Sequence, residues 1–103
     1  MGLHIPIDHA QLTEICRRHQ ISRLSFFGSV LRDDFDPDHS DIDVLVEFDQ
    51  DTKQKLTYFK LAQLADELEQ ALGRRVDLSQ PDTLHPRLRD RILAMAEKLY
   101  DAA

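Results

Sequence analysis

The sequence lacks the features that mark secreted, membrane-spanning and cysteine-rich proteins. Its only cysteine is Cys16, which excludes an internal disulfide and a zinc site built from several cysteines. No apolar run approaches the roughly 20 residues of a membrane-spanning helix. We expect no secretory signal, and we find no repeat, low-complexity tract or linker. Because 103 residues leave room for one hydrophobic core, we expect a single cytoplasmic domain over residues 1–103.

Basic residues are missing from the middle of the chain. Over the whole sequence, 13 Lys and Arg stand against 19 Asp and Glu, for a net charge of −6. Residues 33–51 contain nine Asp and Glu but no Lys or Arg. Such a window repels phosphate unless divalent cations neutralise it, and a nucleic-acid surface needs clustered cations, so we expect no nucleic-acid partner. The window is either a metal site or a solvated loop, and composition alone favours the loop.

Apolar spacing divides the chain into alternating helices and strands. We expect helices over 8–19, 30–32, 53–72 and 86–97, strands over 21–27, 41–48, 74–79 and 99–100, and a loop over 33–40. This order predicts an α/β (α+β) fold, in which helices cover one side of a small sheet. The apolar stripe of each helix is expected to pack in the core, including Leu88, Ile92 and Met95 of the last one.

The strand at 41–48 carries two carboxylates on one face. Ile42 and Val44 fall on the opposite face from Asp41 and Asp43, because successive side chains of a strand alternate. Asp41 and Asp43 can therefore point at one place, with Cα atoms about 6.6 Å apart. Paired carboxylates are unfavourable neighbours without a cation. Hard oxygen ligands suit Mg²⁺ or Mn²⁺, which also takes oxygens from substrate phosphates.

Two further features fit such a site. Gly28-Ser29 follows a strand and precedes a short expected helix, where glycine allows close approach of the backbone and unpaired N–H groups suit an anion. Asp77 lies between the inward-facing Val76 and Leu78, so it faces away from the core like the other two aspartates. Each feature alone is most often a turn or a solvated carboxylate. Together, three carboxylates and an anion-binding turn are typical of sites for metal-assisted phosphoryl or nucleotidyl transfer.

The order of these motifs resembles the minimal nucleotidyltransferase (MNT) family, within the DNA polymerase β-like nucleotidyltransferase superfamily. The family pattern is Gly-Ser, a spacer, Asp-x-Asp, and a third acidic residue on a later strand. Here 11 residues separate Ser29 from Asp41, one more than is usual. The extra residue falls in the expected loop, where an insertion is tolerated. Residues 73–78 and 85–93 also resemble the third-carboxylate strand and the final helix of single-domain members, so the resemblance covers nearly the whole chain.

The resemblance implies a mixed sheet with flanking helices and a defined set of site residues. The implied nucleotide-binding residues are Gly28, Ser29, Arg32 and Ser40, and the implied metal-binding and catalytic residues are Asp41, Asp43 and Asp77. The glycine–serine turn would hold the β- and γ-phosphates of ATP, and the Asp-x-Asp pair would bind Mg²⁺ (or Mn²⁺) ions that bridge to the triphosphate. The third aspartate would bind a second metal ion and help to activate the attacking hydroxyl.

The resemblance also implies a partner. Family members of this length are commonly encoded beside a HEPN-family protein, and members of that group transfer AMP to a tyrosine of the HEPN toxin. The expected function is therefore Mg-dependent transfer of AMP from ATP to a hydroxyl of a HEPN toxin, with this chain as the antitoxin of a hetero-oligomeric pair.

Two alternatives stay open at this point. The chain could neutralise its partner by binding alone, as many small antitoxins do. A calcium loop is the other: Asp36, Asp38, Ser40 and Glu47 occupy positions 1, 3, 5 and 12 of an EF-hand, although position 6 is Asp41 where that loop needs glycine.

Two further interpretations concern helix residues. Arg87, Arg89 and Arg91 fit either a solvated helix face or contacts with triphosphate or an acidic partner. Cys16 lies on the core face of the first expected helix, where it would serve packing.

Overall fold

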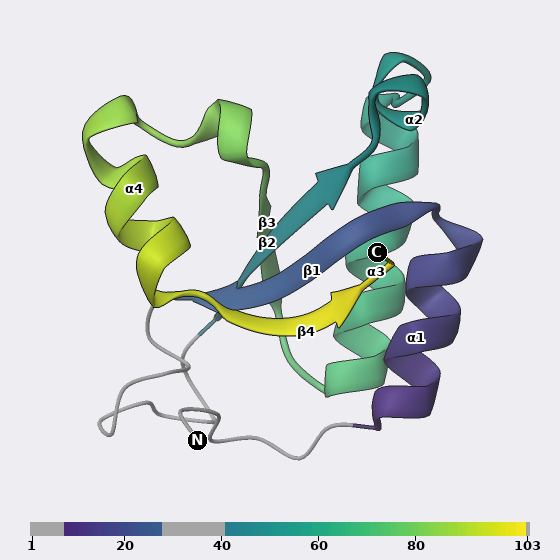
Figure 1. Cartoon of the computed structure of the whole chain (residues 1–103). Coiled ribbons are helices and arrows are strands. Elements are labelled where there is room, and N and C mark those ends of the chain that lie inside the picture. The colour runs from purple at the N-terminus through teal and green to yellow at the C-terminus, as the bar shows by residue number, and fades with distance from the viewer. Residues whose placement is uncertain (1–7, 28–40, 103) are drawn as a thin grey trace.

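Within the described residues, the helices and strands follow the predicted order, except that one expected helix is divided into two. The computed structural model describes residues 8–27 and 41–102 (Figure 1). Its elements are α1 (His9–Arg18), β1 (Ile21–Phe27), β2 (Ile42–Phe48), α2 (Gln50–Gln54), α3 (Tyr58–Leu72), β3 (Val76–Ser79), the 3₁₀ turn η2 (Pro81–Thr83), α4 (Pro86–Met95) and β4 (Glu97–Asp101). The helix and loop expected over 30–40 lie outside the described residues. Among the helices described, none is long and apolar enough to cross a membrane.

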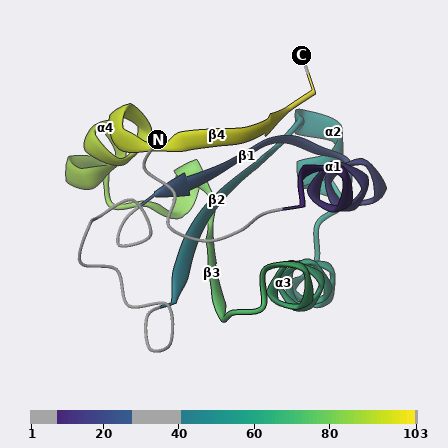
Figure 2. The same ribbon diagram turned by 90° about the horizontal axis from the view of Figure 1, so that it is seen from below.

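The four strands form one mixed sheet in the order β3-β2-β1-β4. Strand β1 runs antiparallel to its neighbours β2 and β4, whereas β2 runs parallel to β3. A parallel pair needs a crossover connection, which α2 and α3 supply. Helices α1 and α3 lie together on one side of the sheet, and α4 lies away from them, next to the start of β4 (Figures 1 and 2). The fold is therefore the expected small mixed sheet with flanking helices.

An apolar core fills the space between the sheet and helices α1 and α3. Its buried members are Leu12, Ile15 and Cys16 of α1, Ile21, Leu24 and Phe26 of β1, Ile42, Val44 and Val46 of β2, and Leu64, Leu68 and Leu72 of α3. On the helices these residues recur at spacings of three and four, and on β2 at a spacing of two, as expected for elements with one buried side. The residues that alternate with Ile42 and Val44 on β2 therefore point to the opposite face of the sheet.

The single helix expected over 53–72 is two helices, α2 and α3. The Asp49 carboxylate accepts a hydrogen bond from the Thr52 N–H at 2.8 Å, which caps α2 three residues before the expected start. The Thr57 hydroxyl accepts one from the Lys60 N–H at 3.1 Å and caps α3. A capping residue has extended backbone, so Thr57 interrupts the helix. The expectation of one helix was wrong, and Thr57 is the signal that could have indicated the break.

Helix α4 does not bury its apolar stripe. None of its residues is buried, and Leu88, Leu93 and Met95 are 50%, 41% and 61% exposed. The helix itself forms for local reasons, since Pro86 suits a first helical turn and the His85 ring accepts a hydrogen bond from the Arg87 N–H at 3.1 Å. The expectation that this stripe packs in the core was therefore wrong. Apolar periodicity indicates that a helix has an apolar side, but not that another element covers it.

Gly73 ends α3 in the left-handed conformation, as its position at the end of the helix predicts. Its φ is 69°, and its N–H donates to the Glu69 carbonyl at 2.8 Å. A Cβ at this position would meet no atom within 4 Å, so Gly73→Ala should cost only backbone strain, about 1 kcal/mol of unfolding free energy. Urea denaturation would measure this loss. Gly73→Asn should lose less, because asparagine tolerates this conformation; equal losses in both variants would contradict the explanation.

A network of charges joins α1 to α3. Glu67 Oε1 lies 2.5 Å from Arg18 Nη1, and Glu67 Oε2 lies 2.5 Å from His19 Nε2. Burial acts to raise the pKa of Glu67, but the hydrogen bonds and charges of His19 and Arg18 outweigh it, so the pKa is lowered. Ionised Glu67 therefore stabilises the contact between the two helices.

This contact predicts a pH-dependent contribution to stability. Glu67→Gln should lower the unfolding free energy by about 1 kcal/mol near neutral pH, the upper end for ion pairs that solvent partly screens. A carboxylate with a lowered folded-state pKa contributes fully above its ordinary pKa of about 4.3, and the contribution disappears as pH falls through the folded-state value. Urea denaturation of the natural chain and of Glu67→Gln, from neutral pH down to below about pH 4.3, measures the difference between their unfolding free energies. Glu14→Gln, which changes an exposed glutamate of α1, is the control. If the two unfolding free energies differed by the same amount at every pH, ionised Glu67 would not be the source of the stabilisation.

Candidate functional site

Strands β2 and β3 bring two of the predicted catalytic carboxylates side by side. In the parallel register, Asp43 lies opposite Asp77, and Ile42 lies opposite Val76. Neighbouring strands are about 4.8 Å apart, so the two carboxylates extend from adjacent points of the sheet. The sequence predicts that these side chains share a face, and the register makes them direct neighbours.

The carboxylate pair lies on the face of the sheet away from α1 and α3. Ile42 and Val44 are fully buried beneath these helices, so Asp43 between them points to the other face. Asp43 is half-buried, whereas Asp77 is exposed. Asp41 is also exposed, and it falls on the same face because it precedes Asp43 by two positions. Asp41 and Asp77 are thus exposed to solvent on this side of the molecule, with the half-buried Asp43 next to Asp77.

Pairing on both sides holds the start of β2 in place. The Ile42 N–H donates to the Arg75 carbonyl at 2.9 Å, which extends the contact with β3 to the residue before that strand. On the other side, Asp43 lies opposite Phe27, the last residue of β1. A carboxylate on a central, paired strand has a fixed backbone, and fixed ligands are what a metal or phosphate site requires.

The chemistry of the donors fits a hard divalent cation. Carboxylate oxygens are the ligands that Mg²⁺ and Mn²⁺ prefer. Within residues 8–27 and 41–102, no three His, Cys, Asp or Glu side chains are arranged to hold a metal ion by themselves. Mg²⁺ in proteins is usually held by one or two carboxylates, with waters and substrate phosphates completing its shell. The pair Asp43 and Asp77 therefore fits a metal ion that is bound together with a phosphate-bearing substrate.

The predicted nucleotide-binding residues lie outside the described part of the chain. These residues are Gly28, Ser29, Arg32 and Ser40. The structure does describe the residues on either side of this segment. The chain enters it after Phe27, opposite Asp43, and returns from it at Asp41, so both ends of the segment are next to the carboxylates.

The arginines of α4 differ in exposure. Arg87 and Arg91 are exposed, which fits a solvated helix face and contacts with triphosphate or an acidic partner equally. Arg89 is half-buried, and its Nε is shielded from solvent without a hydrogen-bond partner among the described residues. Helix α4 leads into β4, where Glu97 lies opposite Phe26, so α4 ends at the same end of the sheet as the carboxylates. The sequence could not single out Arg89, because its burial depends on where the helix lies.

Two smaller expectations can also be compared with the structure. The calcium-loop alternative was wrong, because Glu47 lies inside strand β2, whereas position 12 of an EF-hand belongs at the start of a helix. The packing role of Cys16 is confirmed, since its side chain is fully buried in the core, and burial raises the pKa of its thiol to about 11.

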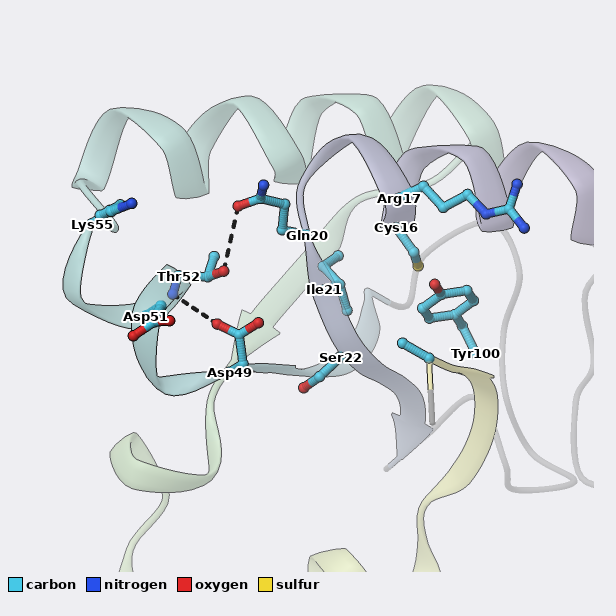
Figure 3. Close-up of a pocket in the computed structure, with 11 residues that line it drawn as sticks. Cys16, Arg17, Gln20, Ile21, Ser22, Asp49, Asp51, Thr52, Lys55 and Tyr100 are labelled. Carbon is cyan, nitrogen blue, oxygen red and sulfur yellow. Dashed lines mark hydrogen bonds between the residues drawn. The ribbon is translucent and has the colours of Figure 1, made fainter.

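A cavity of about 510 Å³ lies at the other end of the sheet from the carboxylates (Figure 3). Asp49, which follows β2, and Ser22 of β1 line it. Figure 3 shows the Thr52 N–H donating to the Asp49 carboxylate, and this hydrogen bond lowers the pKa of Asp49. Because β2 starts near Asp43 and ends before Asp49, this cavity is separate from the carboxylate face.

The chain is similar in sequence to known nucleotidyltransferases. Residues 10–99 match a family model described as a nucleotidyltransferase domain. A protein of Methanocaldococcus jannaschii that is named as a protein adenylyltransferase is 39% identical over 83 residues, which cover 81% of this chain and 84% of that protein.

Solved structures show the same fold. One described as a minimal nucleotidyltransferase aligns with a TM-score of 0.64 and 36% identity over 85% of each chain. A chain from a complex of a tri-AMPylated Shewanella oneidensis HEPN toxin with an MNT antitoxin aligns with a TM-score of 0.61 and 22% identity, over 91% of this chain and 70% of that one. At this lower identity, the likeness concerns the fold alone.

Proposed function

Because the chain belongs to the nucleotidyltransferase domain family, we propose that it transfers AMP from ATP to a tyrosine hydroxyl of a HEPN-family toxin and thereby acts as the antitoxin. The relative named as a protein adenylyltransferase supports AMP as the transferred group. The fold shared with a chain from a complex whose HEPN toxin is AMPylated supports the class of partner. The two proteins would then form a hetero-oligomer.

The observation that carries this proposal is the register of Asp43 with Asp77. In the proposed reaction, the phenol oxygen attacks the α-phosphorus of ATP, the bond to the β-phosphate oxygen breaks, and pyrophosphate leaves. A tyrosine hydroxyl has an ordinary pKa of about 10 and is mostly protonated at neutral pH, so it needs a base. Asp77 is exposed and next to Asp43, which suits it to accept the phenol proton.

The other predicted residues would bind the nucleotide. Mg²⁺ ions held by Asp41 and Asp43, with Asp77 at a second ion, would supply the positive charge that offsets the charge developing on the triphosphate. Without a cation, this acidic face would repel the substrate. The turn at Gly28 and Ser29 would hold the terminal phosphates, and the remaining nucleotide contacts would come from Arg32 and Ser40.

ATP labelled at two positions tests the proposal. The chain would be incubated with Mg²⁺, a HEPN-family toxin from the same genome, and ATP carrying the label on either the α- or the γ-phosphate. Transfer of AMP predicts that only the α-label becomes covalently attached to the toxin. Attachment of the γ-label would indicate phosphorylation. A stable, inactive complex without either label would indicate an antitoxin that acts by binding alone.

A further inference from the structure

A second cavity, of about 420 Å³, adjoins the one in Figure 3. It lies between the end of α1, helix α2 and the first part of α3, and it shares Gln20, Thr52 and Lys55 with its neighbour. Figure 3 shows the Thr52 hydroxyl donating to the side chain of Gln20. Both residues line both cavities, and the two oxygens are 3.4 Å apart. Phe48 at the end of β2 also lines the second cavity. Asp43 is five residues earlier, so about 17 Å of strand separates this cavity from the carboxylates.

Cationic side chains predominate around this second cavity. Arg18, Lys55 and Lys60 line it, against the single carboxylate of Glu67, in a chain whose net charge is −6. Glu67 is already paired with Arg18 and His19. The cavity therefore has excess positive charge that its own carboxylate does not neutralise.

The two lysines are available to bind a ligand. Among the described residues, neither Lys55 nor Lys60 has an ion-pair partner. Asp49 is near enough for Lys55 to lower its pKa slightly, but it lines the neighbouring cavity rather than this one. An anion placed between the lysines would thus meet two charges that no carboxylate already holds.

The remaining lining residues are apolar or neutral. Leu64 is almost fully buried, and Phe48 and Leu56 are half-buried, which gives the cavity an apolar part. Thr52 and Gln63 add a hydroxyl and an amide. The volume lies within the roughly 300–1,000 Å³ of small-molecule sites. This combination suits a ligand with an anionic group and an apolar body.

We propose that this cavity binds a small organic phosphate of about the size of a nucleoside monophosphate. The phosphate lies between Lys55 and Lys60, and the organic part lies against Phe48 and Leu64. A phosphate monoester carries about −1.5 to −2 charges near pH 7, which two lysines balance. This site shares no residue with the carboxylate face, so a test of it does not depend on the proposed AMP transfer.

NMR titration of the ¹⁵N-labelled chain tests the site, with AMP as the probe and EDTA present so that metal-dependent binding does not contribute. AMP should shift the backbone amide signals of Thr52 and Gln63. Lys55→Ala and Lys60→Ala should each weaken AMP binding about tenfold or more, the loss expected for a charge-assisted hydrogen bond. Lys98→Ala, which removes an exposed lysine of β4, is the matched control and should leave AMP binding unchanged.

Two further probes separate the parts of the ligand. Adenosine, which has no charge, and inorganic phosphate, which has no organic body, should both bind more weakly than AMP. Asp43→Asn should leave AMP binding unchanged. Equal affinity for AMP and either fragment, an equal loss in Lys98→Ala, or signal shifts confined to the surroundings of Asp43 and Asp77 would overturn the proposal.

Discussion

Replacing Asp43 with asparagine should reduce AMP transfer to the HEPN toxin on the order of a thousandfold or more. The amide keeps the shape of the carboxylate but has no charge, so it binds Mg²⁺ poorly. The domain should remain folded, because Asp43 points away from the core. Transfer rates with labelled ATP would measure the loss of activity, and urea denaturation would show that the variant is still folded.

Glu47→Gln is the matched control for this variant. Glu47 lies on the same strand and the same face as Asp43 but at the far end of β2, with its carboxylate 3.7 Å from Arg23. It should keep near-normal transfer. Near-normal transfer by Asp43→Asn itself would remove the metal-binding role from this residue.

Leu68→Ala should lower the unfolding free energy by about 3 kcal/mol, a large part of the stability of a domain of this size. Leu68 is fully buried on the face of α3 that packs against the sheet, so truncation leaves a cavity. Leu93→Ala on α4 should change the unfolding free energy by no more than about 0.5 kcal/mol, because Leu93 is 41% exposed. Urea denaturation of both variants compares the two helices. An equal loss in Leu93→Ala would mean that α4 packs in the core after all.

Side-chain alternation was the most reliable signal in the sequence. The period of two from Ile42 to Phe48 predicted β2 to within one residue, and apolar spacing predicted the buried faces of α1 and α3. The same alternation predicted that Asp43 and Asp77 face away from the core. Their direct pairing could not be predicted, because the register of two parallel strands depends on how the crossover helices pack.

The features that the sequence did not predict depend on contacts between distant segments. The apolar stripe of α4 implied a buried helix, but which element covers a helix is a tertiary property. The break between α2 and α3 was predictable in principle from the capping residue Thr57. The basic cavity could not have been found, because Arg18 and Lys60 are far apart in the sequence and meet only when α1 and α3 pack together.

The intact mass of the HEPN toxin after co-expression with this chain tests the proposed AMP transfer most directly. We expect the toxin to carry added AMP, mapped to a tyrosine by fragmentation. Co-expression with a variant in which Asp41, Asp43 and Asp77 are all replaced by asparagine should give unmodified toxin. An unmodified toxin in a stable, inactive complex with both the natural chain and this variant would contradict AMP transfer and show that the chain neutralises its partner by binding alone.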